Sequence, residues 1–104
     1  MRAPLFPWQR VDVSGPSMVP TLRHGDVLIV RYGAPVRAGD IVLARFRTMP
    51  ARLVVKRAVR RQDDGWWLGS DNVFAGGDSE NHGVADVLAK VVVRVRPGRP
   101  GRVR

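Results

Sequence analysis

The chain has 104 residues, 44% of them hydrophobic, which is enough for one domain with a single small core. It contains no cysteine, which excludes disulfide bonds and cysteine-ligated metal sites, and no apolar run approaches the ~20 residues of a membrane helix. The formal net charge is +9, which solvated arginines explain most simply and which is also compatible with an acidic or nucleic-acid partner.

Apolar and β-branched segments, separated by glycine, proline and aspartate turns, recur along the whole chain. We expect strands at residues 10–13, 27–32, 41–47, 53–60, 66–68, 84–88 and 89–96, a hairpin turn at 63–65 and a glycine-rich loop at 69–83. This pattern has no sustained helical period and predicts an all-β fold, a small, antiparallel, partly closed β-barrel. Residues 1–9 do not resemble a signal peptide, so we expect a cytoplasmic protein without a membrane anchor.

Lysine is rare in this chain, and one lysine lies in an apolar segment. Of the 18 basic residues all but two are arginine, and strand alternation places Lys56 on one face with Val54 and Ala58. Arginine stays protonated in proteins, whereas the pKa of a lysine falls when its amine is desolvated. Burial against these side chains and Met18, with Arg57 next in sequence, therefore predicts a neutral amine.

Ser17 lies in a turn that glycine and proline constrain. Gly15 and Pro16 precede it, and Pro20 follows. A serine hydroxyl is a weak nucleophile until a base takes its proton, and a neutral Lys56 amine is such a base. The pair suits acyl transfer such as peptide hydrolysis, with the N–H of Ser17 as an oxyanion donor. The simpler alternative is a turn serine and a lysine whose head reaches water.

Five segments, in order, resemble those of the signal peptidase I family of serine proteases. They are a nucleophile segment, two Gly-Asp segments, a lysine segment and a last loop, at residues 15–22, 24–30, 38–42, 54–57 and 69–79. The resemblance implies a catalytic domain over residues 1–96, followed by a basic, flexible tail at 97–104. It also implies that Ser17 is the nucleophile and Lys56 the general base, with no cofactor and no metal.

The resemblance assigns further positions around this pair. Gly15, Asn72 and Asp78 would shape the site, although Gly15 lacks the side-chain oxyanion donor that some members carry. The hydroxyl that often orients the lysine falls at Gly76 in this chain, so another group or a water has to take its place. Glu80 stands where bacterial members have a basic residue, which argues against an ion pair between that position and Asp78.

Four apolar side chains are expected to line a shallow groove that favours small residues before the scissile bond: Val13, Met18, Val27 and Ile29. Residues 15–25, 66–67 and 71–79 resemble a soluble branch of the family that trims a leader peptide from nickel-type superoxide dismutase. The resemblance therefore implies a protein precursor as the partner, with that dismutase as the substrate. The alternative within the same class is a signal peptidase-like protease that acts on other leaders.

Two other site chemistries are formally possible. Ser17, His82 and either Asp71 or Asp78 could form a Ser–His–Asp triad, which an alanine substitution of the histidine would test. A metal site at His24 and His82 is the weaker hypothesis, because the spacing of the two histidines matches no ligand motif.

Two other protein classes also fit parts of the sequence. A basic β-barrel could stack nucleic-acid bases on Trp66, Trp67 and Phe74, although such tryptophans more often form a core or groove wall, so nucleic acid is not the expected partner. A self-cleaving repressor would share the Ser–Lys pair, but the residues before the core are too few for a DNA-binding segment.

Overall fold

The structure, a computed structural model, describes residues 7–96 and confirms the all-β fold class. The elements are β1 (Trp8–Asp12), β2 (Val27–Tyr32), β3 (Ile41–Phe46), β4 (Val54–Gln62), β5 (Gly65–Gly69), a single helical turn α1 (Ser79–His82) and β6 (Ala85–Val95). The strands form one antiparallel sheet in the order β1-β2-β6-β3-β4-β5. Trp66 of β5 also pairs with Ala85 of β6, which closes β6, β3, β4 and β5 into a partial ring.

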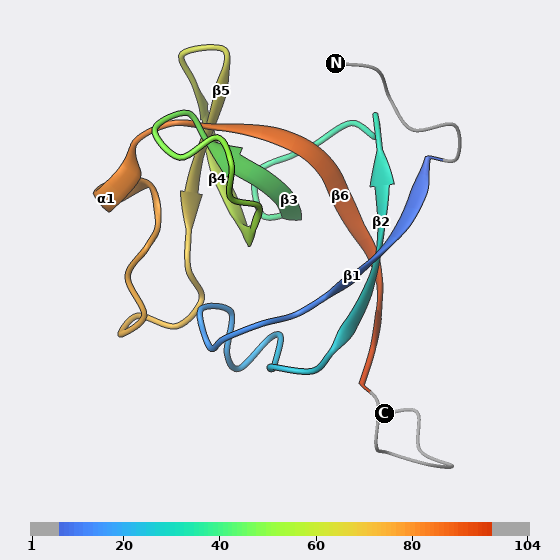
Figure 1. Ribbon diagram of the computed structural model, residues 1–104. Coiled ribbons are helices and arrows are strands. Elements are labelled where there is room, and N and C mark those ends of the chain that lie inside the picture. Colours follow the sequence, from blue (N-terminus) through green and yellow to red (C-terminus); the bar gives the residue numbers. More distant parts are fainter. Residues whose placement is uncertain (1–6, 97–104) are drawn as a thin grey trace.

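Strand β6 connects the two halves of the molecule. Its C-terminal part pairs with β2 and its N-terminal part with β3, so that it arches across the fold (Figure 1). Register shifts between Ile29 and Val30 and between Leu43 and Ala44 mark irregularities of the β-bulge kind, which bend a sheet. The bent sheet encloses two hydrophobic clusters instead of one.

The first cluster packs β2 against the segment that follows β1, and the second fills the ring of β3 to β6. The buried members of the first cluster are Val13, Met18, Leu22, Leu28, Val30, Leu43 and Ala89. Those of the second cluster are Val42, Ala44, Phe46, Ala58, Trp66, Leu68 and Ala85. Val42 and Leu43 belong to different clusters because successive side chains of a strand point to opposite faces.

The two Gly-Asp segments form the same turn before β2 and before β3. In each turn the aspartate side chain accepts the N–H of the arginine three residues earlier, at 2.9 Å. The intervening glycines, Gly25 and Gly39, have φ angles of 91° and 96°, a region that favours glycine. Asp26 is buried, and Arg96, just after β6, forms an ion pair with it. These turns fix where β2 and β3 begin.

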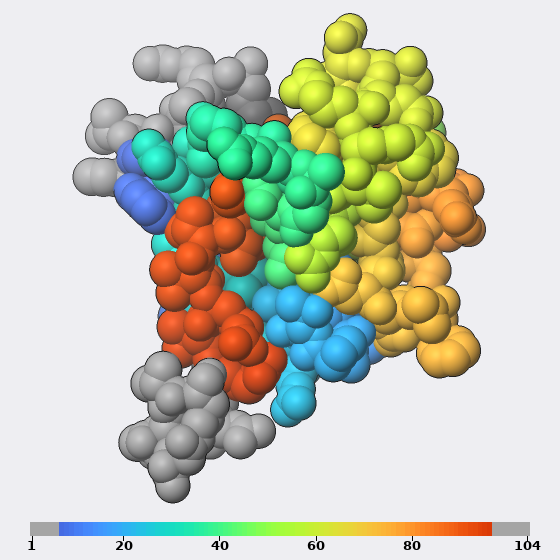
Figure 2. Space-filling view, turned by 180° about the vertical axis from the view of Figure 1, so that it is seen from behind, coloured from blue at the N-terminus to red at the C-terminus, as the bar shows by residue number. Residues whose placement is uncertain are grey.

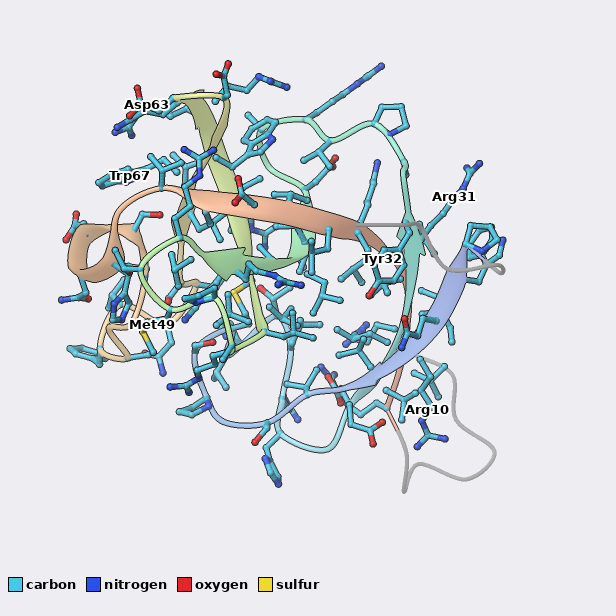
Figure 3. All side chains as sticks on the ribbon, turned by 45° about the horizontal axis from the view of Figure 1, so that its top comes forward. Arg10, Arg31, Tyr32, Met49, Asp63 and Trp67 are labelled. Carbon is cyan, nitrogen blue, oxygen red and sulfur yellow. The ribbon has the colours of Figure 1, made fainter. Side chains whose placement is uncertain are left out.

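The β4–β5 hairpin turns through Asp63 and Asp64, as the sequence predicts. Their φ angles of 52° and 62° fit a two-residue turn of the I′ type, which suits the twist of antiparallel strands. Figure 3 shows this hairpin, with Asp63 and Trp67, on the opposite side of the view from Arg31 on β2.

Arginine side chains cover both tryptophans of this hairpin. The Arg60 guanidinium lies 4.8 Å from the ring centroid of Trp67, and that of Arg61 lies 5.7 Å from the centroid of Trp66. Trp66 is also 7% exposed and belongs to the second hydrophobic cluster. The tryptophans therefore do not form the open stacking surface that the nucleic-acid hypothesis requires.

Two elements differ from the sequence-based prediction. The pattern predicts separate strands at 84–88 and 89–96, whereas β6 is continuous because it changes partner from β3 to β2 without a turn. The predicted loop at 69–83 contains α1, whose first turn is capped by the Asp78 side chain and which ends at Gly83, with a φ of 78°. Four residues are too few for helical periodicity to be visible.

The basic tail expected at residues 97–104 lies outside the described residues, as do residues 1–6. Within residues 7–96, no helix combines the length and the apolar character needed to cross a membrane.

Candidate active site

A cavity of about 650 Å³ opens between the turn after β1, the start of β4 and the loop before α1. Ser17 and Lys56, the two residues that the sequence singles out, both line this cavity. Its lining comprises residues 11–18, Leu43, Phe46, Met49, residues 52–56, residues 74–77 and His82. Figure 2 shows the Ser17 turn, in blue, packed beside the golden residues of the last loop.

The turn that carries Ser17 is held by its own backbone and by a buried anchor. The N–H of Val19 donates to the Pro16 carbonyl at 3.1 Å, and the N–H of Leu22 donates to the Met18 carbonyl at 2.8 Å. The Met18 side chain is buried in the first hydrophobic cluster. Ser17 itself stays half-buried at the cavity. This arrangement holds the hydroxyl on a fixed support.

Gly15, two residues before Ser17, has a φ of 85°, where an L side chain would be strained. Its N–H donates to Nδ1 of His24 at 3.1 Å. His24 thus contacts the turn rather than a metal cluster, and within residues 7–96 no group of three or more potential ligand side chains could hold a metal ion.

Asn72 fastens the last loop to this turn. Its side-chain amide donates to the Pro16 carbonyl at 3.1 Å, and its backbone N–H donates to the Ser17 carbonyl at 2.9 Å. Its side-chain oxygen accepts the N–H of Phe74 at 3.0 Å. The loop is therefore attached directly to the residue that the sequence indicates as the nucleophile.

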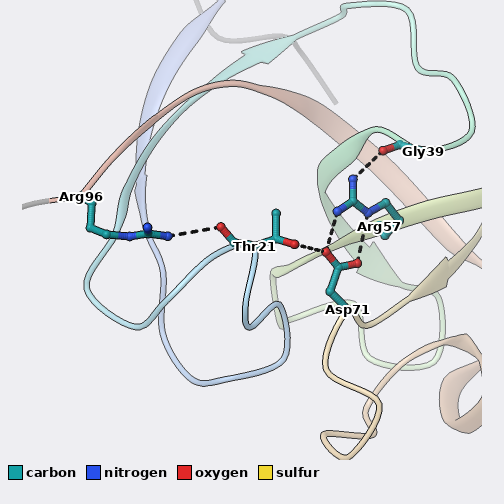
Figure 4. Close-up of polar contacts among 5 residues, drawn as sticks. All are labelled: Thr21, Gly39, Arg57, Asp71 and Arg96. Carbon is teal, nitrogen blue, oxygen red and sulfur yellow. Dashed lines mark hydrogen bonds and ion pairs between the residues drawn. The ribbon is translucent and has the colours of Figure 1, made fainter. Parts of the chain in front are cut away.

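Asp71 makes a second link between the loop and the rest of the site (Figure 4). Arg57 donates to both oxygens of its carboxylate and also to the Gly39 carbonyl, while Thr21 donates its hydroxyl to the same carboxylate. The Arg57 guanidinium, assisted by Thr21, holds the pKa of Asp71 below its ordinary value. Arg96 also reaches the Thr21 carbonyl. The turn that carries Ser17, β4 and the last loop are therefore joined by one polar network.

Lys56 lies on β4 and is 5% exposed. Burial lowers the pKa of its amine; the nearby Asp78 carboxylate opposes this effect, and the positive charge of Arg52 adds to it. The sequence suggests Arg57 as the neighbouring cation, but Arg57 pairs with Asp71 instead. The alternation of side chains along β4 explains the difference, because positions 56 and 57 face opposite ways.

The Lys56 amine donates to the hydroxyl oxygen of Ser70 at 2.9 Å, and this oxygen lies 3.3 Å from the Gly76 carbonyl oxygen. Gly77 lies close enough that an added Cβ would be 3.9 Å from the amine. Position 76 is a glycine and offers no hydroxyl, and the hydroxyl that contacts the lysine comes from Ser70 instead. Within residues 7–96, no hydrogen bond joins Ser17 directly to Lys56, although both line the cavity.

The four residues expected in the substrate groove fall into two pairs. Val13 and Met18 line the cavity, whereas Val27 and Ile29 lie on β2 outside its lining. Alternation along β2 directs Leu28 and its neighbours at even positions into the core, and the odd positions to the other face.

Sequence reasoning missed several residues of the site. Ser70 contacts the lysine, Arg52 and His82 line the cavity, and Phe74, at its rim, is 94% exposed. The one available signal was that Ser70 is among only four serines in the chain. The others occupy positions whose role depends on how the loop folds.

The hydrogen bonds between histidine and aspartate that a Ser–His–Asp triad requires are absent from the described residues. The Asp71 carboxylate is engaged by Arg57, and that of Asp78 accepts the N–H of Glu80 at the start of α1. The His82 ring packs on Phe46, with 5.1 Å between their centroids. In the described part of the chain, no side-chain hydrogen bond connects this histidine to either aspartate.

Two comparisons with known proteins relate this chain to peptidases. Residues 9–92 match the family model described as Peptidase S24-like, a span that includes both Ser17 and Lys56. The chain is also 30% identical to the mitochondrial ATP-independent inner membrane protease subunit 1a of Arabidopsis thaliana, over 82% of this chain and 68% of that protein. The class of protein is therefore a signal peptidase-like peptidase. More particularly, the chain belongs to the Peptidase S24-like family.

Proposed function

We propose that this chain is a serine endopeptidase in which Ser17 and Lys56 form the catalytic dyad. The observation that supports the proposal is the environment of Lys56, which is buried, has a lowered pKa and lines the same cavity as Ser17. A neutral amine in such a cavity can act as a general base toward a nearby hydroxyl. The catalytic domain in this proposal spans residues 1–96, and residues 97–104 form a basic tail.

In the proposed acylation step, the Lys56 amine takes the hydroxyl proton while the Ser17 oxygen forms a bond to the substrate carbonyl carbon. The peptide C–N bond then breaks, and the protonated amine gives its proton to the leaving nitrogen. In the second step the amine deprotonates a water molecule, which attacks the ester. This attack releases the carboxylate product and restores the serine hydroxyl.

Backbone groups of the nucleophile turn are the proposed oxyanion donors. Within residues 7–96 the N–H of Ser17 has no hydrogen-bond partner, so it can bind a developing negative charge. The N–H of Gly15 is already bonded to His24. Asn72 is assigned the role of holding the turn, and Asp78 that of placing a carboxylate near the lysine.

The proposed substrate is a protein precursor whose leader peptide is removed, with nickel-type superoxide dismutase as the first candidate. The cavity has an apolar wall at Val13 and Met18 and an apolar rim at Phe74, which suit an extended peptide. The dismutase assignment depends on the resemblance of residues 15–25, 66–67 and 71–79, and other leader peptides are the alternative. A cytoplasmic location, which cell fractionation would test, belongs to the same proposal.

The direct test incubates the purified protein with the dismutase precursor and with unrelated leader-bearing precursors. The new N-terminus is then read by mass spectrometry. Ser17→Ala and Lys56→Arg should each lower kcat/KM by more than about 100-fold, because the first removes the nucleophile and the second a base that can lose its proton. The matched control is Lys90→Arg, which keeps the surface ion pair with Asp40 and should leave cleavage unchanged. Cleavage by either dyad variant at the wild-type rate would contradict the proposal.

A further inference from the structure

Ser70, which follows β5, is the hydroxyl in contact with the buried lysine. Its oxygen accepts a hydrogen bond from the Lys56 amine at 2.9 Å and lies 3.3 Å from the Gly76 carbonyl oxygen. We propose that Ser70 is a positioning residue of the peptidase, which orients the Lys56 amine toward Ser17. This inference rests on the proposed Ser–Lys dyad and adds to it a residue at a position that the family resemblance does not assign.

The hydrogen count explains how one hydroxyl can orient an amine. Ser70 has a single hydroxyl hydrogen, which its contact with the Gly76 carbonyl uses. Its oxygen is then left as an acceptor, and the Lys56 amine supplies the N–H. A neutral amine has two N–H bonds and one lone pair. Fixing one N–H on Ser70 restricts the directions open to the lone pair of an amine that lines the same cavity as Ser17.

The backbone of the loop explains why this hydroxyl comes from Ser70. Gly76 and Gly77 have φ angles of 66° and 73°, so the chain makes two successive left-handed steps beside the amine. A serine at position 76 would be strained in that conformation. The loop therefore presents only a carbonyl there, and the hydroxyl is supplied from its other end.

Ser70 is also held rigidly enough to position another group. Its neighbour Asp71 is clamped by Arg57 and Thr21, and the next residue, Asn72, is bonded to the Ser17 turn. Ser70 thus lies between β5 and two consecutive anchored residues. A side chain with a restrained backbone loses little entropy on ordering and can fix the direction of its partner.

The kinetic test compares Ser70→Ala with Ser70→Thr, which retains a hydroxyl, and with Thr48→Val, which removes a hydroxyl from an exposed loop. Ser70→Ala should lower kcat about 10- to 100-fold, the usual effect of a misdirected catalytic group, with KM changed by less than about twofold. Ser70→Thr should recover most of this loss, and Thr48→Val should match the wild type. A kcat for Ser70→Ala within about twofold of the wild type would overturn the inference.

The pH profile separates positioning from a structural role. If Ser70 only packed the loop, its removal would admit water to Lys56, and the acidic midpoint of kcat/KM would move to higher pH. A hydrogen-bond acceptor stabilises the charged amine at least as much as the neutral amine, so removing the acceptor alone cannot raise the pKa of Lys56. The positioning role therefore predicts that the acidic midpoint of kcat/KM does not rise. A clear rise would therefore contradict it.

A readout without substrate keeps this inference distinct from the proposed function. The chain has only two lysines, so 13Cε-lysine labelling gives two NMR signals, and Lys90→Arg assigns them. Ser70→Ala should shift the Lys56 signal, and Ser70→Thr should return it toward the wild-type position. An unmoved signal would overturn the contact itself. Retained activity in Ser17→Ala, with the signal shifted as expected, would instead overturn the dyad.

Discussion

A buried amine destabilises a small fold, and Lys56 is such an amine. Its side chain is 5% exposed on the inner face of β4, with the neutral hydroxyl of Ser70 as its hydrogen-bond acceptor. A neutral acceptor compensates an ammonium less than a paired carboxylate does, so burial favours the uncharged form. The cost to stability and the proposed function as a base therefore have the same origin.

Replacing this amine by an apolar side chain should stabilise the protein. We expect Lys56→Met to raise the free energy of unfolding at pH 7 by about 1–3 kcal/mol, the cost of burying a polar group whose hydrogen bonding is incomplete. Because the folded-state pKa of Lys56 is lowered, the unfolded chain binds more protons between that pKa and about 10.4. Wild-type stability should therefore rise with pH in this range, and the advantage of the variant should shrink.

Urea unfolding of both proteins from pH 7 to pH 10 measures this difference. Lys90→Met is the control, because it removes a partly exposed lysine that pairs with Asp40. A destabilised Lys56→Met protein, or a difference independent of pH, would contradict the account of burial.

The sequence predicts some of these residue-scale features and not others. The burial of Lys56 follows from its position on the same strand face as Val54 and Ala58. Side chains two residues apart on a strand point to the same face, and the two apolar residues indicate that this face is buried. The contacts of Ser70 and Arg52 do not follow, because they depend on the path of an irregular loop. The alternation of residues within a strand predicts which side chains share a face, but it does not predict which distant loop packs against that face.

At the scale of elements, β5 lies tightly against the start of β6 at the point where β5 begins. A Cβ added to Gly65 would lie 2.5 Å from the backbone oxygen of Ala85 and 2.7 Å from a methyl group of Val84. Such distances cannot be accommodated without moving β5 away from β6. The next residue of β5, Trp66, pairs with Ala85, and this pairing closes the ring of β3 to β6.

We therefore expect Gly65→Ala to lower the free energy of unfolding by about 1–3 kcal/mol, the usual cost of overpacking. Gly69→Ala, at the other end of β5, is the matched control. Its added methyl would meet only a side-chain methyl of Val59, at 3.2 Å. Urea midpoints compare the two variants, and an equal loss in both would show that the approach of β5 to β6 is not the cause.

Strand positions are the best-predicted elements of this fold. The segments at β2, β3 and β4 combine β-branched residues with flanking turns, so that local sequence and final structure agree. Two features could not be predicted. The continuity of β6 depends on a change of partner along one strand, and α1 depends on its cap at Asp78 within a loop.

For the molecule as a whole, the cavity depends on three segments that are distant in sequence. The turn that carries Ser17, β4 and the last loop meet at the Asp71 carboxylate, which accepts from Arg57 and Thr21 (Figure 4). Asp71 and its arginine are both half-buried, so solvent screens their charge-assisted hydrogen bonds less than it screens those of a fully exposed pair. The site should therefore assemble and come apart as a unit.

Asp71→Asn should lower the free energy of unfolding at pH 7 by about 1.5–3 kcal/mol, the range for hydrogen bonds to charged groups. Because the pKa of Asp71 is held below its unfolded value, its contribution is complete above about pH 4 and is lost as the pH falls through the lowered pKa. The difference between wild type and variant should therefore shrink in acid. Chemical unfolding from pH 7 to pH 2.5 measures it, and a gap that widens in acid would be contradictory.

The protonation state of Lys56 is the central claim of this account, and direct titration tests it. The 13Cε signals of the two lysines, followed against pH in the wild-type protein, give both pKa values in one experiment. We predict that Lys56 titrates well below Lys90 and that its midpoint coincides with the acidic limb of kcat/KM for precursor cleavage. A Lys56 amine that titrates near the ordinary value of about 10.4 would contradict its role as the base.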